Sequence, residues 1–196
     1  GVFNVALPFT LISWGETRID SALASVLNGM VPLFTTVIAH FWLHDEKITL
    51  PRIAGLTVGF IGVVVLVSRD LSPGSTHSSL WGQAAVLAAA MSYATAVTFS
   101  RKYLRGQPPV VQSTMGLLIA GALQWCVAPI VERPLHIPTA PITWLALAWL
   151  GLLGSCLAYL LYFHLINTWD ATRTSMVTYV LPVIGLILGV IFLGEK

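Results

Sequence analysis

Two apolar stretches of the chain each carry polar residues and a proline at helical spacing, and these are the residues best suited to bind a solute. In the first stretch, Ser25, Asn28 and Pro32 are spaced i, i+3 and i+7, which places them on one face of a helix. A proline leaves a backbone carbonyl without its helical partner, and amides and hydroxyls can hydrogen-bond a neutral or zwitterionic molecule. The alternative is that these groups join neighbouring helices. The second row consists of Ser175, Thr178, Tyr179 and Pro182.

Three further polar residues lie inside apolar sequence on other segments: Asn4, which is isolated, Ser92, which follows a run of alanines, and Tyr159, which shares a helical face with Tyr162. Polar groups at membrane depth are candidates for a functional site, and hydrogen bonding between packed helices is the competing interpretation. The predicted substrate pathway combines both rows with these three side chains. Its members are Asn4, Ser25, Asn28, Pro32, Ser92, Tyr159, Ser175, Thr178, Tyr179 and Pro182.

The sequence contains no pattern typical of an enzyme. It has no Ser-His-Asp set, no pair of intramembrane carboxylates and no glycine-rich phosphate loop, so we expect neither catalysis nor a cofactor. The spacing of His40, His44, Asp45 and Glu46 resembles that of metal ligands. These residues end an apolar segment, where polar groups belong beside the lipid headgroups, and we therefore predict no metal site. His164 is either a proton-coupling group or an interfacial histidine.

The elements that must position these residues are transmembrane helices. Of the 196 residues, 56% are hydrophobic and 9% are charged, whereas about 25% are charged in ordinary globular domains. All ten basic and eight acidic residues lie between, or at the ends of, stretches long enough to span a bilayer. The sequence therefore predicts an all-α, polytopic membrane helix bundle. The predicted spans are 2–15, 21–43, 50–68, 79–100, 111–131, 142–166 and 172–193.

Charge limits the partners and suggests an orientation. The net charge is only +2, and no basic run is interleaved with aromatic residues, so we expect the lipid bilayer and not nucleic acid as the surroundings. The densest basic cluster is formed by Arg101, Lys102 and Arg105. Lys and Arg are enriched in cytoplasmic connections, which places this cluster on the cytoplasmic side.

The sequence also repeats itself when residues 19–32 are placed over residues 169–182. The two copies begin five spans apart, an odd number, so they cross the membrane in opposite directions. Inverted repeats of this kind are typical of secondary transporters, whose substrate site lies near the midplane between the repeats. The matched pairs are Asp20 with Asp170, Ser25 with Ser175, Pro32 with Pro182 and, after one gap, Glu46 with Glu195.

Both copies resemble helices of a known family. The run Pro32-Leu33-Phe34-Thr35 followed by Glu46 resembles the fourth helix of EamA-type members of the drug/metabolite transporter superfamily, and Thr178 to Glu195 is similar to their ninth. The resemblance implies ten helices in two inverted five-helix repeats, with both termini in the cytoplasm. This chain would be a fragment with seven of the ten. Asp45 departs from the pattern, which often has glycine before the glutamate.

The resemblance also divides the chain. Residues 1–68 would hold the last three helices of the first repeat, 69–78 a connecting loop, and 79–196 the first four helices of the second. The expected function is that of a secondary transporter, a carrier or exporter of small neutral or zwitterionic metabolites such as amino acids, which works by alternating access in the cytoplasmic membrane. An intramembrane enzyme and a seven-helix receptor are the alternatives. Coupling to protons and the oligomeric state stay open.

Overall fold

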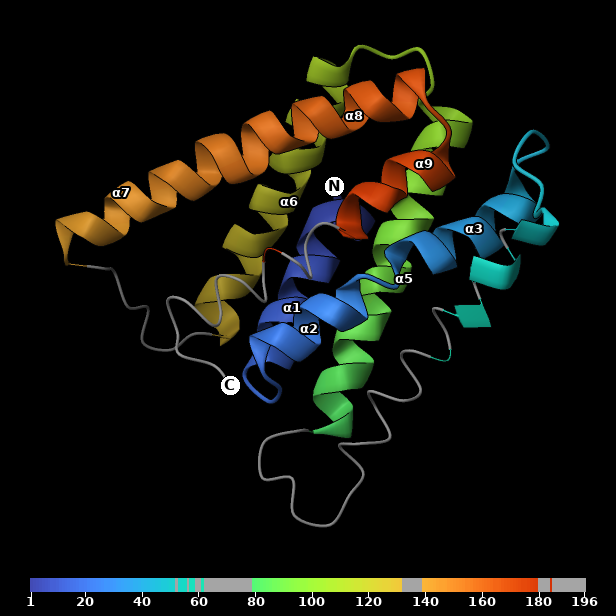
Figure 1. Ribbon diagram of the computed structural model, residues 1–196. Helices are drawn as coiled ribbons and strands as arrows, with labels where there is room; N and C mark the ends of the chain where they lie inside the picture. The colour runs from blue at the N-terminus through green and yellow to red at the C-terminus, as the bar shows by residue number, and fades with distance from the viewer. Residues whose placement is uncertain are drawn as a thin grey trace.

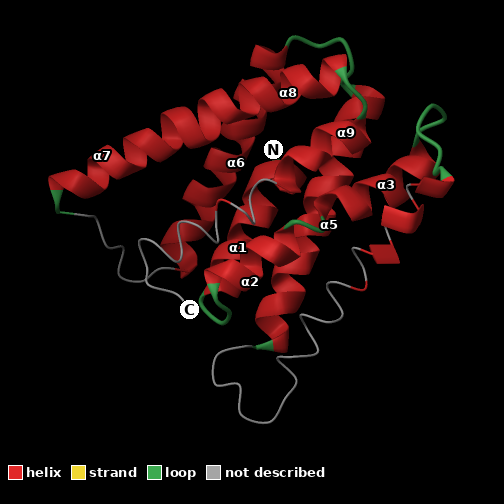
Figure 2. Cartoon of the chain, viewed as in Figure 1, coloured by secondary structure: helices red, strands yellow, loops and turns green. Residues whose placement is uncertain are grey.

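The computed structural model describes residues 1–51, 53–55, 57, 58, 61, 79–131, 139–179 and 184. These residues form helices joined by short connections, with no strand among them (Figures 1 and 2). The elements are η1 (Val2–Ala6), α1 (Leu7–Glu16), α2 (Ser21–Asn28), α3 (Val31–Trp42), α5 (Leu80–Tyr103), α6 (Pro109–Val131), α7 (Pro141–Trp149), η2 (Leu150–Leu157), α8 (Ala158–Thr168), α9 (Ala171–Ser175) and η3 (Met176–Tyr179).

Helix α5 is the column against which the first part of the chain packs (Figure 1). Helices α1, α2 and α3 all contact it, and so does α9 from the other end of the sequence. The buried face of α5 is rich in small side chains, among them Ala85, Ala89, Ala90 and Ala94. Small residues let helix backbones approach closely inside a membrane, so α5 can contact several helices at once.

Helices α1 and α5 approach each other closely at their crossing, where two glycines face each other. A Cβ atom added at Gly82 would lie 2.9 Å from Cγ2 of Ile19, and one at Gly15 would lie 2.8 Å from Cγ2 of Val86. Both distances are shorter than van der Waals contact, so neither position has room for a side chain. The two glycines therefore set the separation of α1 and α5.

The first predicted row of polar residues lies on a helix that is interrupted. Gly29 and Met30 form a turn between α2 and α3, and Pro32 stands in the first turn of α3, where it displaces no helical hydrogen bond. Asp20 precedes α2 with an extended backbone, and Asp170 precedes α9 in the same way. The two aspartates matched by the internal repeat thus occupy the same place at the start of a short helix.

The helices α2 and α9 begin at opposite ends of α5. Ile19, just before α2, belongs to the same buried cluster as Val86 in the first half of α5. Ala171, the first residue of α9, shares a cluster with Val97 near the end of α5. The two copies therefore enter the bundle from opposite ends, as an inverted repeat requires. We call the end that carries Arg101 the basic end.

Residues 141–168 form a continuous helical path through α7, η2 and α8. Helix α8 packs against α6, α5 and α9, and its buried residues are Phe163 and Ile166. Helix α7 extends away from the bundle (Figure 1) and has no buried residue. The functional residues of this path are consequently those of α8.

Four of the described stretches are long and apolar enough to cross a membrane: Leu23–Trp42, Leu80–Tyr103, Pro109–Ala128 and Pro141–Thr168. They match four of the predicted spans, and η1 with α1 matches the predicted span 2–15. The predicted spans 50–68 and 172–193 lie largely outside the described residues, as do the loop 69–78 and Pro182. Within the described part of the chain, the structure confirms the all-α helix bundle.

Candidate functional site

Asn4 lies in the interior of the bundle and keeps one polar atom unsatisfied. It belongs to η1, a π-helical turn, and is 8% exposed. Its side-chain amide oxygen is buried and has no hydrogen-bond partner. Its backbone carbonyl accepts a hydrogen bond from the hydroxyl of Tyr159, with the two oxygens 2.7 Å apart. The structure therefore brings together Asn4 and Tyr159, two predicted pathway residues that are far apart in the sequence.

Three tyrosines continue this polar cluster toward the basic end. Tyr93 on α5 lies beside Tyr159, close enough for the two hydroxyls to interact. The rings of Tyr159 and Tyr162 meet edge to face, with centroids 6.4 Å apart. Ser92 on α5 donates to the backbone carbonyl of Phe3 at 2.8 Å. We call Asn4, Ser92, Tyr93, Tyr159 and Tyr162 the tyrosine cluster.

Tyr93 was missed by the sequence analysis. It follows a run of alanines and adjoins Ser92, in a stretch whose small residues indicate close helix packing. A tyrosine in an apolar helix is compatible with simple core packing or with an interfacial ring. Only its contact with Tyr159, which lies on another helix, places it in the cluster.

Asn28 ends the first of the two short helices and resembles Asn4 in one respect. It is half-buried, and its amide oxygen is buried without a hydrogen-bond partner. Ser25, one turn earlier, is also half-buried, and Pro32 after the break is buried. Buried amide oxygens without a partner are uncommon in folded proteins. Among the predicted pathway residues that the structure describes, Asn4 and Asn28 have one, and so does Gln112 on the cavity wall, so all three are candidates for contact with a solute.

The polar side chains of the second predicted row, unlike those of Asn4 and Asn28, have hydrogen-bond partners. The hydroxyl of Ser175 donates to the carbonyl of Thr172 at 2.7 Å, and that of Thr178 donates to the carbonyl of Ser175 at 2.7 Å. Each hydroxyl therefore donates its hydrogen to a backbone carbonyl three residues earlier in the chain and offers only lone pairs to another molecule. The side chain of Tyr179 and all of Pro182 lie outside the described residues.

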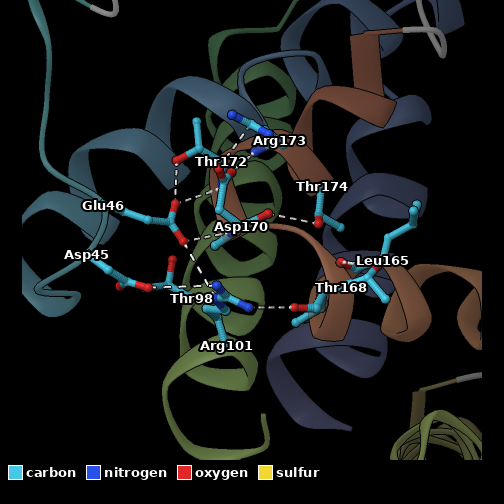
Figure 3. A network of polar contacts seen from close by, with 12 residues as sticks. Asp45, Glu46, Thr98, Arg101, Leu165, Thr168, Asp170, Thr172, Arg173 and Thr174 are labelled. Atoms are coloured by element: carbon cyan, nitrogen blue, oxygen red, sulfur yellow. Dashed lines mark hydrogen bonds and ion pairs between the residues drawn. The ribbon is translucent and has the colours of Figure 1, made fainter. Parts of the chain in front are cut away.

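The densest polar network lies at the basic end, and it was not predicted. Glu46, which follows α3, is 4% exposed, and its carboxylate reaches the start of α9 (Figure 3). It accepts hydrogen bonds from the backbone N–H of Ala171 at 2.8 Å, from the N–H of Thr172 at 3.0 Å and from the hydroxyl of Thr172 at 2.8 Å. The carboxylate thus satisfies two N–H groups that have no acceptor within the helix itself.

Arg101 supplies the opposite charge. It stands in the last turn of α5, is 9% exposed, and places Nε 3.9 Å from Oε1 of Glu46. One of its terminal nitrogens donates to the carbonyl of Ile166 at 3.2 Å, close to the end of α8. The other lies 3.7 Å from Asp45, whose side chain is 57% exposed. The ion pair is therefore bonded to the end of one helix and the start of the next (Figure 3).

Next to this pair, Asp170 caps α9. Its carboxylate accepts from the N–H of Arg173 at 2.6 Å and forms an ion pair with the side chain of Arg173 at 3.2 Å. The internal repeat pointed at this region, because it matched Asp170 with Asp20 and Glu46 with Glu195. It did not indicate that Glu46 contacts the helix of the other copy. Glu195 itself lies outside the described residues.

The set with metal-like spacing is not assembled around one point. Nδ1 of His40 accepts the backbone N–H of Ile48 at 3.2 Å, and the carboxylate of Glu46 is turned into α9. His44 is exposed, as is His164 on α8. Within the described residues no group of three His, Cys, Asp or Glu side chains has the geometry of a metal site.

A mostly apolar cavity of about 750 Å³ lies between η1, α5 and α6. Asn4, Thr95 and Gln112 contribute its polar atoms together with Ser100 and Gln107, and Gly1 and Val2 form part of the wall. The cavity is large enough for a small metabolite. Of the predicted pathway residues in the described part of the chain, Asn4 is the one that lines it.

The chain resembles curated proteins from bacteria and archaea along its whole length. It is 25% identical over 195 residues to an uncharacterized transporter of Archaeoglobus fulgidus, covering all of this chain and 67% of the relative. It is 27% identical to the "Probable amino-acid metabolite efflux pump" of Salmonella typhimurium, covering 97% and 64%, and 26% identical to the "Probable terminal-alkyne amino-acid exporter" of Streptantibioticus cattleyicolor, covering 94% and 60%. The chain thus spans about three fifths to two thirds of the length of these relatives.

No solved structure matches the chain. The sequence model of the EamA-like transporter family matches residues 1–68 and 80–196, on both sides of the predicted connecting loop. Together with four apolar helices of spanning length, this match identifies an integral, multi-pass membrane protein. The chain belongs to the EamA-like transporter family.

Proposed function

We propose that the chain forms the core of a secondary carrier that moves small neutral or zwitterionic metabolites, such as amino acids, across the cytoplasmic membrane by alternating access. Membership of the EamA-like family carries the proposal, and two relatives are named for amino-acid efflux. The buried, unpartnered amide oxygens of Asn4 and Asn28 support it as well, because a passing solute with N–H groups would satisfy them.

The types of side chain in the bundle favour a solute without net charge. In the described helices the charged side chains lie at helix ends, whereas the interior offers amides, hydroxyls and tyrosine rings. An ion in the middle of the bundle would lack a counter-charge, whereas a zwitterion carries its own. We place the solute beside the tyrosine cluster, with Tyr159 and Asn4 on one side and Asn28, from the first predicted row, also exposed to the pathway.

The alternatives fit the chain less well. An intramembrane enzyme needs charged or metal-binding groups within its spans, and the family and its named relatives are transporters. A seven-helix receptor has no reason to contain an inverted repeat. Transport under an imposed pH gradient would test whether the movement of solute is coupled to protons.

Tyr159→Phe should reduce solute flux about fivefold in vesicles that contain the full-length protein. The substitution removes the hydroxyl that donates to the Asn4 carbonyl and lies beside Tyr93, and a hydrogen bond contributes about 1 kcal/mol, which corresponds to about a fivefold change in rate. Efflux of a mixed pool of labelled amino acids measures the effect. Tyr103→Phe is the matched control, since Tyr103 is exposed at a helix end and its loss should leave flux unchanged. Equal flux in both variants would remove Tyr159 from the pathway.

Asn28→Ala should raise KM severalfold while leaving the melting temperature unchanged. The amide oxygen of Asn28 bonds no other residue in the described structure, so its removal sacrifices no hydrogen bond of that oxygen. Asn167→Ala is the matched control, because its amide donates to the carbonyl of Gln107 at 2.9 Å. That variant should lose stability and keep its KM. If Asn28→Ala also loses stability and keeps its KM, Asn28 is a packing residue.

A further inference from the structure

We propose that Glu46 and Arg101 form a latch that joins the two repeats and closes the basic end of the transport pathway. This inference rests on the proposed function, since a latch has meaning only in a protein that opens and closes. It assigns to Glu46 the role of a positioning residue, one that acts through α9 and not by contact with the solute.

The contacts of Glu46 cross from one repeat to the other. Glu46 lies in the part of the chain that the repeat assigns to the first copy, directly after α3. Its partners all come from the second: Ala171 and Thr172 at the start of α9, and Arg101 at the end of α5. Arg101 extends the connection to Ile166 on α8. A relative movement of the two repeats at this end must therefore break the hydrogen bonds of Glu46.

An apolar plug lies directly beneath the latch. It consists of Ala39, Leu43, Val97, Phe163, Ile166 and Ala171, all buried, and the rings of Tyr159 and Tyr162 pack against it. Ile166 and Ala171 belong to the plug and at the same time offer backbone groups to the latch. From the tyrosine cluster toward the basic end, a solute therefore meets first the plug and then the latch. These buried side chains fill the space between α3, α5, α8 and α9 at this end.

The latch has the properties that a reversible closure needs. A carboxylate that accepts three hydrogen bonds and faces a cation fixes its partners in one geometry. Each of these groups lies at a helix end, near the aqueous surface, where water can replace the lost partner when the repeats separate. A purely apolar contact would have no such replacement. Interfaces with two alternative sets of partners are what alternating access requires.

Asp45 shows that position and not charge alone defines the latch. It adjoins Glu46 in the sequence, carries the same charge and lies within 3.7 Å of Arg101. Its side chain is 57% exposed, however, and in the described structure it makes no hydrogen bond to α9. Asp45 is therefore the matched control for Glu46.

The test measures how readily a cysteine in the plug reacts from each side of the membrane. The full-length protein carries Ala39→Cys, with Cys126 and Cys156, both exposed, replaced by alanine. A membrane-impermeant maleimide is added to vesicles of known orientation. Glu46→Gln should raise the labelling rate of this cysteine from the basic side about tenfold, because loss of a charged hydrogen-bond partner shifts a two-state equilibrium by that order. Asp45→Asn should leave the rate unchanged.

A second reporter separates opening from general loosening. Ala24→Cys is as buried as the first position but lies in the cluster near the opposite end, and its labelling should not rise in the Glu46→Gln protein. Equal increases at both reporters, or no increase at the plug while solute is still transported, would overturn the latch. A selective increase at the plug in a protein that moves no solute would support the latch as a conformational contact and count against the proposed function.

Discussion

Replacing Glu46 with alanine is expected to lower the free energy of unfolding by about 3–5 kcal/mol, the loss typical when one partner of a buried ion pair is removed. The carboxylate is 4% exposed and bonds two backbone N–H groups and a hydroxyl at the start of α9. Without it, these donors lose their acceptor, and Arg101 loses the buried one of its two carboxylate partners. Reversible unfolding of the full-length protein in mixed detergent micelles, followed by circular dichroism, measures the difference.

Asp45→Ala gives the comparison. Exposed ion pairs contribute about 0–1 kcal/mol, and the side chain of Asp45 is 57% exposed and 3.7 Å from Arg101. The alanine variant at position 45 should therefore unfold almost like the parent protein. Equal losses in the two variants would show that Arg101 needs negative charge nearby and nothing more specific, and that the hydrogen bonds of Glu46 to α9 contribute little.

Gly82→Leu is expected to have an effect of similar size, about 3 kcal/mol, through overpacking and not through lost bonds. A Cβ at this position would already lie 2.9 Å from Cγ2 of Ile19, 3.0 Å from Cβ of Arg18 and 3.1 Å from the carbonyl oxygen of Gly15. The last of these atoms belongs to the backbone of α1, so the helices α1 and α5 must separate to admit the side chain. The same unfolding measurement detects the loss.

Gly121→Leu controls for the change from glycine to leucine in a helix. Glycine is about 1 kcal/mol less favourable than alanine in a helix interior and leucine is close to alanine, so this change stabilises a helix where space allows. Gly121 on α6 has no atom within 4 Å of an added Cβ, and its variant should be at least as stable as the parent. If Gly82→Leu is equally stable, the crossing of α1 and α5 is wider than the structure places it.

Glu46 and Gly82 represent two different kinds of contact between the helices of the bundle. The glycine contact holds α1 and α5 together at the end opposite the basic cluster, by shape alone. The latch holds α3, α5, α8 and α9 together at the basic end through charges and hydrogen bonds. The close packing of α1 and α5 suits a contact that stays formed, because the dispersion attraction between the helices is lost once their surfaces separate. Contacts of the second kind can be exchanged for water, which suits a joint that opens.

The class of the protein and the positions of most described helices followed from the sequence. Hydropathy and span length are local properties, and the bilayer enforces them because it offers no partner to an unsatisfied backbone group. The internal repeat also predicted that Asp20 and Asp170 would start equivalent helices, because the same local signal recurs. It predicted their opposite directions as well, because the count of spans between the copies is odd.

The network at the basic end was decided by the tertiary structure alone. A glutamate at the end of an apolar segment has the same local sequence whether it faces lipid headgroups or another helix. Glu46 accepts a hydrogen bond from Thr172, which lies 126 residues later in the sequence. Tyr159 donates one to the carbonyl of Asn4, which lies 155 residues earlier. Ser175, predicted to face the pathway, turns its hydroxyl to the carbonyl of Thr172. Hydropathy determines which residues are removed from water. The packing of the helices determines which of these residues contact each other, because hydrogen bonds and ion pairs depend on distances of a few ångströms.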